Sequence, residues 1–341
     1  MTEGRSVARD RWVSVILLLR GIGKQPVQRA ALGVLMLVVV IALFADMLAS
    51  SQPLLLYFNH RLYILPNLTH PSGLRIYDND LLLRYLRPGD WALLPAVPWG
   101  YNGHDLTHVF RAPDANHWLG TDSSGRDVLA RIVHGARVSL IVGVLSVSVL
   151  SFVGVTLGTL AGYFGGLLDI VLMRLLEIVH SIPTILLLVT LLSVLAPEGY
   201  SAVVAMTAVI GLVWWTDVAR LIRGEILRIK ELDYVHAARA QGAGTARIIF
   251  RHVLPNAISP VLVSATFALA AAILGEGALS FLGFGIPDDM ASWGGLLNEV
   301  RSNIDAWWLA LFPGAAIFVT VTAFNLLGEG LRDALDPRSR G

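Results

Sequence analysis

Residues 236–256 read HAARAQGAGTARIIFRHVLPN and form a short basic segment in a chain that is 55% hydrophobic. The composition of residues 224–241 favours a helix, and Gly242 is a typical residue for a helix end. Thr245 is a suitable N-cap for a second helix over residues 246–254, which Pro255 would end. The pattern predicts a helix-turn-helix between two much more hydrophobic regions.

The second predicted helix has a basic side and an apolar side. Arg247 and Arg251 are four residues apart, and Ile249 with Val253 and Phe250 with Leu254 repeat at the same spacing. A short helix of this kind needs a partner surface. From these residues alone, the segment could be a DNA-binding helix-turn-helix, a loop solvated among lipid headgroups, or a docking element for a cytoplasmic protein. Both its ends continue into membrane spans, which leaves little room to enter a major groove.

The composition places the chain among membrane proteins. Of its 341 residues only 15% are charged, and the mean hydropathy is +0.64, whereas soluble domains carry roughly 25% charged residues. The net charge of +1 gives no reason to expect a nucleic-acid partner. The absence of cysteine from the sequence excludes disulfides, thiolate metal ligands and cysteine nucleophiles.

Six stretches are apolar and long enough to span a bilayer, which takes about 20 residues. They are residues 30–48, 138–168, 170–196, 201–221, 256–279 and 307–328. Pro183 should kink the third span, because proline removes a backbone donor and clashes with the preceding turn. Serine and glycine recur in the spans, which suits close helix packing.

The basic residues predict the orientation. They concentrate in the segment 1–29 and in the loop 222–256, so both termini and this loop are expected in the cytoplasm. Residues 49–137 are then external, residues 138–328 form the membrane core, and residues 329–341 form a cytoplasmic tail. A cleaved signal peptide is the alternative for the N-terminus, but the apolar run is too long and no clear cleavage site follows.

The external residues 49–117 are too long for a simple loop and should have a fold of their own. The stretch LLLYFNHRLYIL predicts two short strands that turn at residues 58–60. Five histidines invite a metal site, and His104 and His108 would share a face if their segment were helical. A packed cap or docking surface is the favoured interpretation, because proline and glycine break the region.

Two groups of polar residues lie in or near the membrane. Arg174 and Glu177 are spaced to form an ion pair on one helix face. This pair could lie at the inner membrane interface, or it could be an internal contact that moves during transport. Glu276 is expected near the outer end of the fifth span, where it could line a gate or reach headgroup depth. The neighbouring residues Ser280 and Phe281, and Trp293 in a predicted short outer helix, complete this candidate gate.

The spacing of the basic segment resembles the EAA loop of permease subunits of ATP-binding-cassette (ABC) importers. That pattern is Glu-Ala-Ala, three residues, Gly, nine residues, then a hydrophobic residue, any residue, Leu and Pro. This sequence matches it with His236-Ala237-Ala238, Gly242 and Leu254-Pro255. His236 stands in place of the glutamate and His252 in place of the usual isoleucine.

Further stretches are similar to the C-type permeases of oligopeptide and dipeptide importers. They are HWLGTDSSGRDVLARIVHGARVSL at 117–140, the SFLGFG and SWGGLL pieces, and LGEGLRDALDPR at 327–338, so the resemblance covers residues 117–341. The long external insert is more similar to the longer C-type permeases associated with microcin C and oligopeptide uptake.

This resemblance implies an all-α integral membrane protein with six transmembrane helices, a type I ABC importer permease fold, and an extracytoplasmic insert between helices 1 and 2. The chain would be a multi-pass protein of the bacterial cytoplasmic membrane that imports peptides or peptide-like compounds and forms half of the pathway. The implied partners are a B-type permease, two ATP-binding subunits, an extracytoplasmic peptide-binding protein and membrane lipid. No cofactor is expected on this chain, since ATP and Mg would be used by the ATP-binding subunits.

The resemblance also implies which residues couple the chain to the ATP-binding subunits. They are His236, Ala237, Ala238, Gly242, Ala243, Thr245, Arg247, Arg251, Leu254 and Pro255. No catalytic residue is expected: GIGKQ at 21–25 lacks the glycine and the Ser or Thr that a phosphate loop needs. The alternatives are an ATP-independent secondary transporter or channel, and a membrane-bound enzyme. The former needs ion-coupling carboxylates near mid-membrane, whereas Asp46, Glu177, Asp217 and Glu276 are all expected near span ends.

Overall fold

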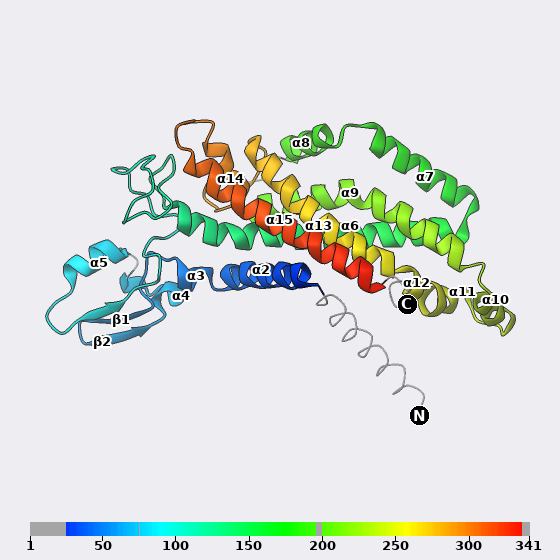
Figure 1. Cartoon of the computed structure of the whole chain (residues 1–341), viewed down its shortest axis with the longest axis horizontal. Coiled ribbons are helices and arrows are strands. Elements are labelled where there is room, and N and C mark those ends of the chain that lie inside the picture. Colours follow the sequence, from blue (N-terminus) through cyan, green and yellow to red (C-terminus); the bar gives the residue numbers. More distant parts are fainter. Residues whose placement is uncertain (1–24, 75, 196–199, 336–341) are drawn as a thin grey trace, which may run out of the picture.

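The computed structural model describes residues 25–74, 76–195 and 200–335. Long helices lie roughly along one axis, with a small sheet at one end and a group of short helices at the other (Figure 1). Most of the N-terminal segment 1–29, which was used to predict the orientation, lies outside the described residues.

Among the described residues, five helices are long and apolar enough to cross a membrane. They are α2 (Pro26–Leu43), α6 (Val128–Phe164), α9 (Tyr200–Ile229), α13 (Ser259–Phe281) and α15 (Trp308–Leu335). A sixth span is possible only if α7 (Gly166–Ser181) and α8 (Thr184–Leu195) cross together, because they are bent by 90°. The bend lies at Pro183, so the predicted kink is confirmed, but a continuous third helix is wrong.

Several helices continue beyond the apolar stretch that predicted the span. The helix α6 begins at Val128, inside the segment assigned to the external region, since Oδ1 of Asp127 caps it by accepting a hydrogen bond from the Ala130 N–H at 2.7 Å. Likewise, α9 continues past residue 221 to Ile229, and α15 continues past residue 328 to Leu335. Hydropathy marks where charge begins, whereas backbone hydrogen bonding decides where a helix ends.

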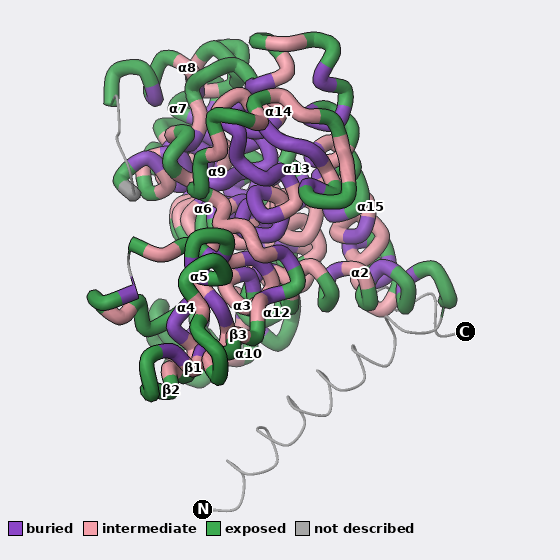
Figure 2. The backbone as a smooth tube through the Cα atoms, turned by 90° about the vertical axis from the view of Figure 1, so that its left-hand side faces the viewer, coloured by how far each residue is buried: buried purple, intermediate pink, exposed green. Residues whose placement is uncertain are grey.

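The core of the bundle is the packing of α6 along α9. Three glycines spaced by four residues, Gly154, Gly158 and Gly162, form the contact stripe on α6. A Cβ atom at Gly158 would lie 2.4 Å from the Ala219 carbonyl oxygen, so only glycine permits this approach. Buried residues gather around α6, α9 and α13, whereas α2, α7 and α8 are largely exposed (Figure 2). The last three offer surfaces that lipid or another subunit must cover.

The external insert contains a three-stranded antiparallel sheet of order β2-β1-β3. Its strands are β1 (Leu55–Phe58), β2 (Arg61–Ile64) and β3 (Trp91–Leu93). The predicted hairpin is confirmed, and Asn59 and His60 form its turn with positive φ values of 51° and 61°. One face of the sheet packs on the helix α5 (Asn79–Tyr85) through the buried side chains Leu56, Phe58, Leu74 and Leu82.

Short elements connect the insert to the bundle. They are α3 (Ala45–Leu48), α4 (Pro66–Thr69) and the 3-10 turn η1 (Ser72–Leu74). The Asn79 side-chain amide donates hydrogen bonds to the carbonyls of Ser50 and Pro98, both at 2.8 Å, and thereby holds α5 against two loop segments. The insert is therefore attached to the outer ends of α2 and α6.

Two histidines of the insert pair with carboxylates. His117 Nδ1 lies 2.8 Å from Asp127, the residue that caps α6, and His108 Nδ1 lies 2.6 Å from Asp105. Residues 104–108 are not helical, so the condition under which His104 and His108 would share a helix face is not met. Among the described residues, no group of three or more His, Cys, Asp or Glu side chains could hold a metal ion.

Candidate functional site

The basic segment lies at the end of the bundle opposite the insert (Figure 1). It consists of α10 (Asp233–Ala240), α11 (Thr245–Arg247), a π-helical turn (Ile248–Val253) and α12 (Leu254–Ala257). The prediction of one helix over residues 224–241 is wrong, because α9 ends at Ile229 and the chain turns before α10. Lys230 stabilises this turn by donating a hydrogen bond to the Gly162 carbonyl at 3.0 Å, near the end of α6.

Gly242 ends α10 as predicted. Its φ of +81° is one that L side chains rarely adopt. The Gly242 N–H donates to the Arg239 carbonyl at 3.0 Å, and the Ala243 N–H donates to the Ala238 carbonyl at 3.1 Å. These two bonds form a Schellman motif, which fixes the direction in which the chain leaves α10.

Two predicted details of the second helix are wrong. Thr245 is not an N-cap but the first residue of α11, and Gly244 takes the capping position without a side-chain hydrogen bond. Pro255 does not end the helical path, because it occupies the first turn of α12, where a missing N–H is tolerated. The π-helical turn connects α11 to α12, and the helical backbone continues almost directly from α12 into α13.

The segment is anchored to the bundle by buried apolar side chains. Val235 of α10 and Ile248 and Val253 of the π-helical turn are at most 2% exposed and belong to the main core. The Tyr234 hydroxyl also donates to the His252 carbonyl at 3.2 Å and so joins the two halves of the segment. A force applied to its outer surface is therefore transmitted to α9 and α13.

The outer surface of the segment is basic and apolar. Phe250 is 71% exposed, and Ala246, Arg247 and Arg251 are exposed beside it in the sequence. Within the described part of the chain, neither arginine side chain has a hydrogen bond or an ion pair. Of the predicted coupling residues, His236, Ala237, Gly242, Thr245 and Pro255 are also exposed, whereas Ala238, Ala243 and Leu254 are half-buried. We call these exposed and half-buried residues the coupling surface.

His236, at the position of the family glutamate, has an acidic neighbour. Its Nε2 lies 3.7 Å from the Glu231 carboxylate, and both side chains are exposed. The EAA pattern has a glutamate at the position of His236. Here the Glu231 carboxylate lies beside the His236 ring instead.

The second predicted group lies where α13 meets α6 and the short helix α14 (Trp293–Glu299), which confirms the predicted outer helix. Glu276 is fully buried and accepts hydrogen bonds from the Ser139 hydroxyl of α6 at 3.0 Å and the Ser280 hydroxyl at 2.9 Å. Trp293 is also buried, and its indole N–H donates to the Ile132 carbonyl at 3.0 Å. The buried carboxyl links α13 to α6 through the Ser139 hydroxyl.

Phe281 does not join this cluster, because its side chain is 42% exposed. Only its carbonyl takes part, accepting a hydrogen bond from the Asn298 amide at 2.7 Å. The other predicted gate residues, Glu276, Ser280 and Trp293, do come together.

The opposite end of α14 is held by a buried ion cluster that the sequence analysis missed. Arg131 Nη1 lies 2.6 Å from Asp122 and 3.1 Å from Glu299, and Arg126 also contacts both carboxylates. Burial and the nearby Asp122 charge raise the pKa of Glu299, while Arg131 and hydrogen bonds from Ser123 oppose the shift. Only the SGRD spacing hinted at this cluster, since its Glu299 member is distant in the sequence.

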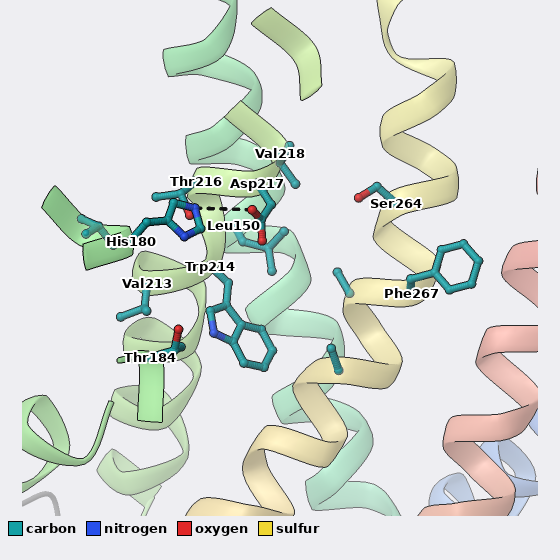
Figure 3. A pocket seen from close by; sticks show the side chains of 13 residues that line it. Leu150, His180, Thr184, Val213, Trp214, Thr216, Asp217, Val218, Ser264 and Phe267 are labelled. Atoms are coloured by element: carbon teal, nitrogen blue, oxygen red, sulfur yellow. Dashed lines mark ion pairs between the residues drawn. The ribbon is translucent and has the colours of Figure 1, made fainter. Parts of the chain in front are cut away.

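A cavity that no local sequence pattern indicates lies beside the bend between α7 and α8. It encloses about 340 Å³, and His180 and Asp217 lie 3.5 Å apart at its edge (Figure 3). Asp217 lies within α9, which continues past the predicted end of the fourth span to Ile229.

Comparison with known proteins agrees with this geometry. Residues 154–341 match the family described as binding-protein-dependent transport system inner membrane component. The chain belongs to this family. The matched residues contain the bend, the coupling surface, Glu276 and α14, whereas the insert lies outside them.

Curated relatives of this inner membrane component are transport permeases. The dipeptide transport system permease protein DppC of Alkalihalophilus pseudofirmus is 42% identical over 67% of this chain and 75% of its own length. The glutathione transport system permease protein GsiD of Pectobacterium atrosepticum is 42% identical over 70% and 78%. The oligopeptide transport system permease protein OppC of Bacillus subtilis is 38% identical over 71% and 78%.

The fold is also found among solved structures. A chain of the MetNI methionine ABC transporter, in an inward-facing conformation, matches 60% of this chain and 97% of its own with a TM-score of 0.50 and 19% identity. This likeness concerns the fold alone, and with it the predicted importer permease fold is confirmed.

Proposed function

We propose that the chain is the membrane-spanning permease subunit of an ATP-driven importer of peptides or peptide-like compounds. It forms half of the translocation pathway, and a B-type permease forms the other half. Two ATP-binding subunits dock on the coupling surface, and an external binding protein delivers the substrate. Both termini and the coupling surface then face the cytoplasm. The dipeptide, glutathione and oligopeptide permeases named above support the substrate class.

One observation carries the coupling role. Phe250, Arg247 and Arg251 form an exposed surface without partners in the described chain, while Ile248 and Val253 beside them are buried in the main core. An apolar side chain between two cations fits a cleft of another protein with an acidic rim. Because the opposite side of the segment is packed into the core, movement of that protein displaces α9 and α13 together.

The decisive experiment compares two glycines of the coupling surface in the assembled transporter. Gly242→Val forces a β-branched side chain to a φ of +81°, whereas Gly244→Ala places a small side chain where no atom lies within 4 Å. We expect Gly242→Val to abolish peptide uptake and release the ATP-binding subunits, with membrane insertion unchanged. Gly244→Ala should retain both. Ala238→Asp is expected to act like Gly242→Val, because Ala238 is half-buried under the turn.

Normal uptake by Gly242→Val and Ala238→Asp would reject the coupling assignment. An ATP-independent secondary transporter or channel remains the rival from another class. It requires no ATP-binding subunit, so purification in mild detergent separates the two proposals: the importer permease retains an ATP-binding subunit and a second permease. Uptake by proteoliposomes that contain this chain alone and no ATP would favour the rival.

A further inference from the structure

The cavity beside the bend between α7 and α8 has the composition of a binding site. Its wall includes Leu150 of α6, His180 of α7, Thr184 of α8, Trp214 and Asp217 of α9, and Ser264 of α13. The volume of about 340 Å³ is within the range of small-ligand sites, which start at about 300 Å³. Five helices therefore contribute to one hollow.

Asp217 lies at membrane depth. The 30 residues of α9 extend about 45 Å, whereas the hydrocarbon layer is about 30 Å thick. Asp217 is about 26 Å of helix from Tyr200 and about 18 Å from Ile229. It therefore lies within the hydrocarbon layer for every placement in which α9 crosses it fully. A carboxylate at this depth marks a pathway or a functional site and does not face lipid.

The charges around the cavity are predominantly negative. Asp217 is the only acidic side chain among the described residues that line it, and its side chain is 72% exposed in the isolated chain. His180 lies 3.5 Å from it and supplies a full positive charge only when protonated. The carbonyl end of α7 adds a negative partial charge at His180. The start of α8 at Thr184 adds a positive one, but of about half an elementary charge only.

The backbone beside the cavity supports a water-filled site. Residues 182 and 183 separate α7 from α8 at the 90° bend, and the helices on both sides border the cavity. Non-helical backbone at membrane depth is tolerated where it lines a cavity or is buried in protein. Figure 3 shows His180 and Asp217 facing each other, the Trp214 ring beside them, and Ser264 on the opposite helix.

We propose that this cavity is a subsite for a primary ammonium group of the transported substrate, with Asp217 as its counter-ion. The Trp214 ring offers a π face to the same cation, and the Ser264 hydroxyl offers a neutral acceptor. The ammonium can be the α-amino group of a peptide or a lysine side chain. The inference rests on the proposed import function, since it assigns one site on that pathway.

The absence of cysteine from the sequence allows a direct test. Ser264→Cys introduces a single thiol into this chain at the cavity, and its alkylation is followed in the assembled transporter by mass analysis of this chain, without the binding protein. The probes are tri-alanine, its N-acetylated form, and N-acetyl-Ala-Lys-Ala. We expect tri-alanine or N-acetyl-Ala-Lys-Ala to slow alkylation, which identifies the source of the ammonium. N-acetylated tri-alanine should give no protection.

In the Ser264→Cys protein, the further change Asp217→Asn should raise the peptide concentration needed to slow alkylation about tenfold or more. The reason is that the ammonium group loses an ion-paired hydrogen bond. Asp217→Glu should largely restore protection. Glu177→Gln is the matched control, since its carboxylate is on α7 but pairs with Arg174 on the exposed surface at 2.5 Å. It should leave protection unchanged.

Three results would overturn the subsite: protection unaffected by Asp217→Asn, equal protection by N-acetylated tri-alanine, or no protection by any probe. ATP-dependent uptake of tri-alanine by the wild-type transporter is measured in parallel. If uptake is present while protection fails, only the subsite is wrong. If uptake is absent, the proposed import function fails.

Discussion

Arg131 of α6 and Glu299 of α14 lie 3.1 Å apart, and both side chains are at most 7% exposed. The guanidinium also contacts Asp122 at 2.6 Å, so it connects the segment before α6 to the helix that follows α13. Together with the hydrogen bond from the Trp293 indole to the Ile132 carbonyl of α6, this contact holds α14 at both of its ends. The outer ends of α6 and α13 are therefore joined through one short helix.

Breaking the buried cluster should destabilise the permease. Arg131→Met leaves Asp122 and Glu299 with one cation fewer in a buried site, so we expect a loss of about 3–5 kcal/mol. The measurement is thermal unfolding in detergent. Arg84→Met is the control, because Arg84 pairs with Asp80 at the surface with side chains 72% and 58% exposed. Its effect should stay below about 1 kcal/mol. Similar unfolding temperatures for the two variants would contradict the role of the cluster.

Filling the contact between α6 and α9 should prevent close packing. A Cβ atom at Gly158 would lie 2.2 Å from the Ile222 side chain and 2.4 Å from the Ala219 carbonyl. Gly158→Val therefore forces the helices apart, and we expect a loss of at least about 1–3 kcal/mol or failure to accumulate folded protein. Gly33→Ala on α2 is the control, since no atom lies within 4 Å of its added Cβ. Size-exclusion profiles and unfolding temperatures measure both, and a monodisperse, equally stable Gly158→Val protein would disprove the packing.

The buried Glu276 should tolerate an amide but not an apolar side chain. Its partners are the hydroxyls of Ser139 and Ser280, which an amide can also engage. Glu276→Gln is expected to keep most of the stability and uptake. Glu276→Leu leaves the buried Ser139 hydroxyl without its partner, at a cost of about 1–3 kcal/mol. Unfolding temperature and uptake rate are compared, and the reverse order of the two variants would contradict the structural role.

The insert should show a pH-dependent turn at Asp105. Hydrogen bonds from Thr107 and His108 lower the pKa of this carboxyl from 3.8 to about 2. Because the folded value is the lower one, the turn is stabilised at pH values above 3.8 and loses that stabilisation as the pH falls toward 2. The protection of the Thr107 amide against hydrogen exchange, taken relative to the intrinsic exchange rate at each pH, should fall over that window, because its N–H donates to Asp105 at 3.0 Å. Asp105→Asn should remove the pH dependence, and a flat profile in the unaltered protein would refute the prediction.

Local patterns in the sequence sufficed for the apolar helices, the hairpin and the coupling segment. Apolar runs reveal spans because lipid requires them, and the turn at Asn59 and His60 follows from its neighbours alone. The Gly242 turn and the Arg174–Glu177 pair are also local, within five residues. The sequence also marked Pro183 as a bend, although not its size of 90°.

Tertiary structure decided the rest, since it depends on residues far apart in the chain. Glu276 resembled an accessible gate residue until Ser139 and α14 enclosed it. The Arg131–Glu299 contact and the His180–Asp217 cavity join separate helices, so no local spacing reports them. Hydropathy also did not predict the full lengths of α6, α9 and α15. Backbone hydrogen bonding continues each helix into charged residues, beyond the apolar stretch that hydropathy detects. Sequence alone thus identified the apolar segments long enough to span a membrane and the basic segment between α9 and α13, whereas packing determined which polar groups face each other between the helices.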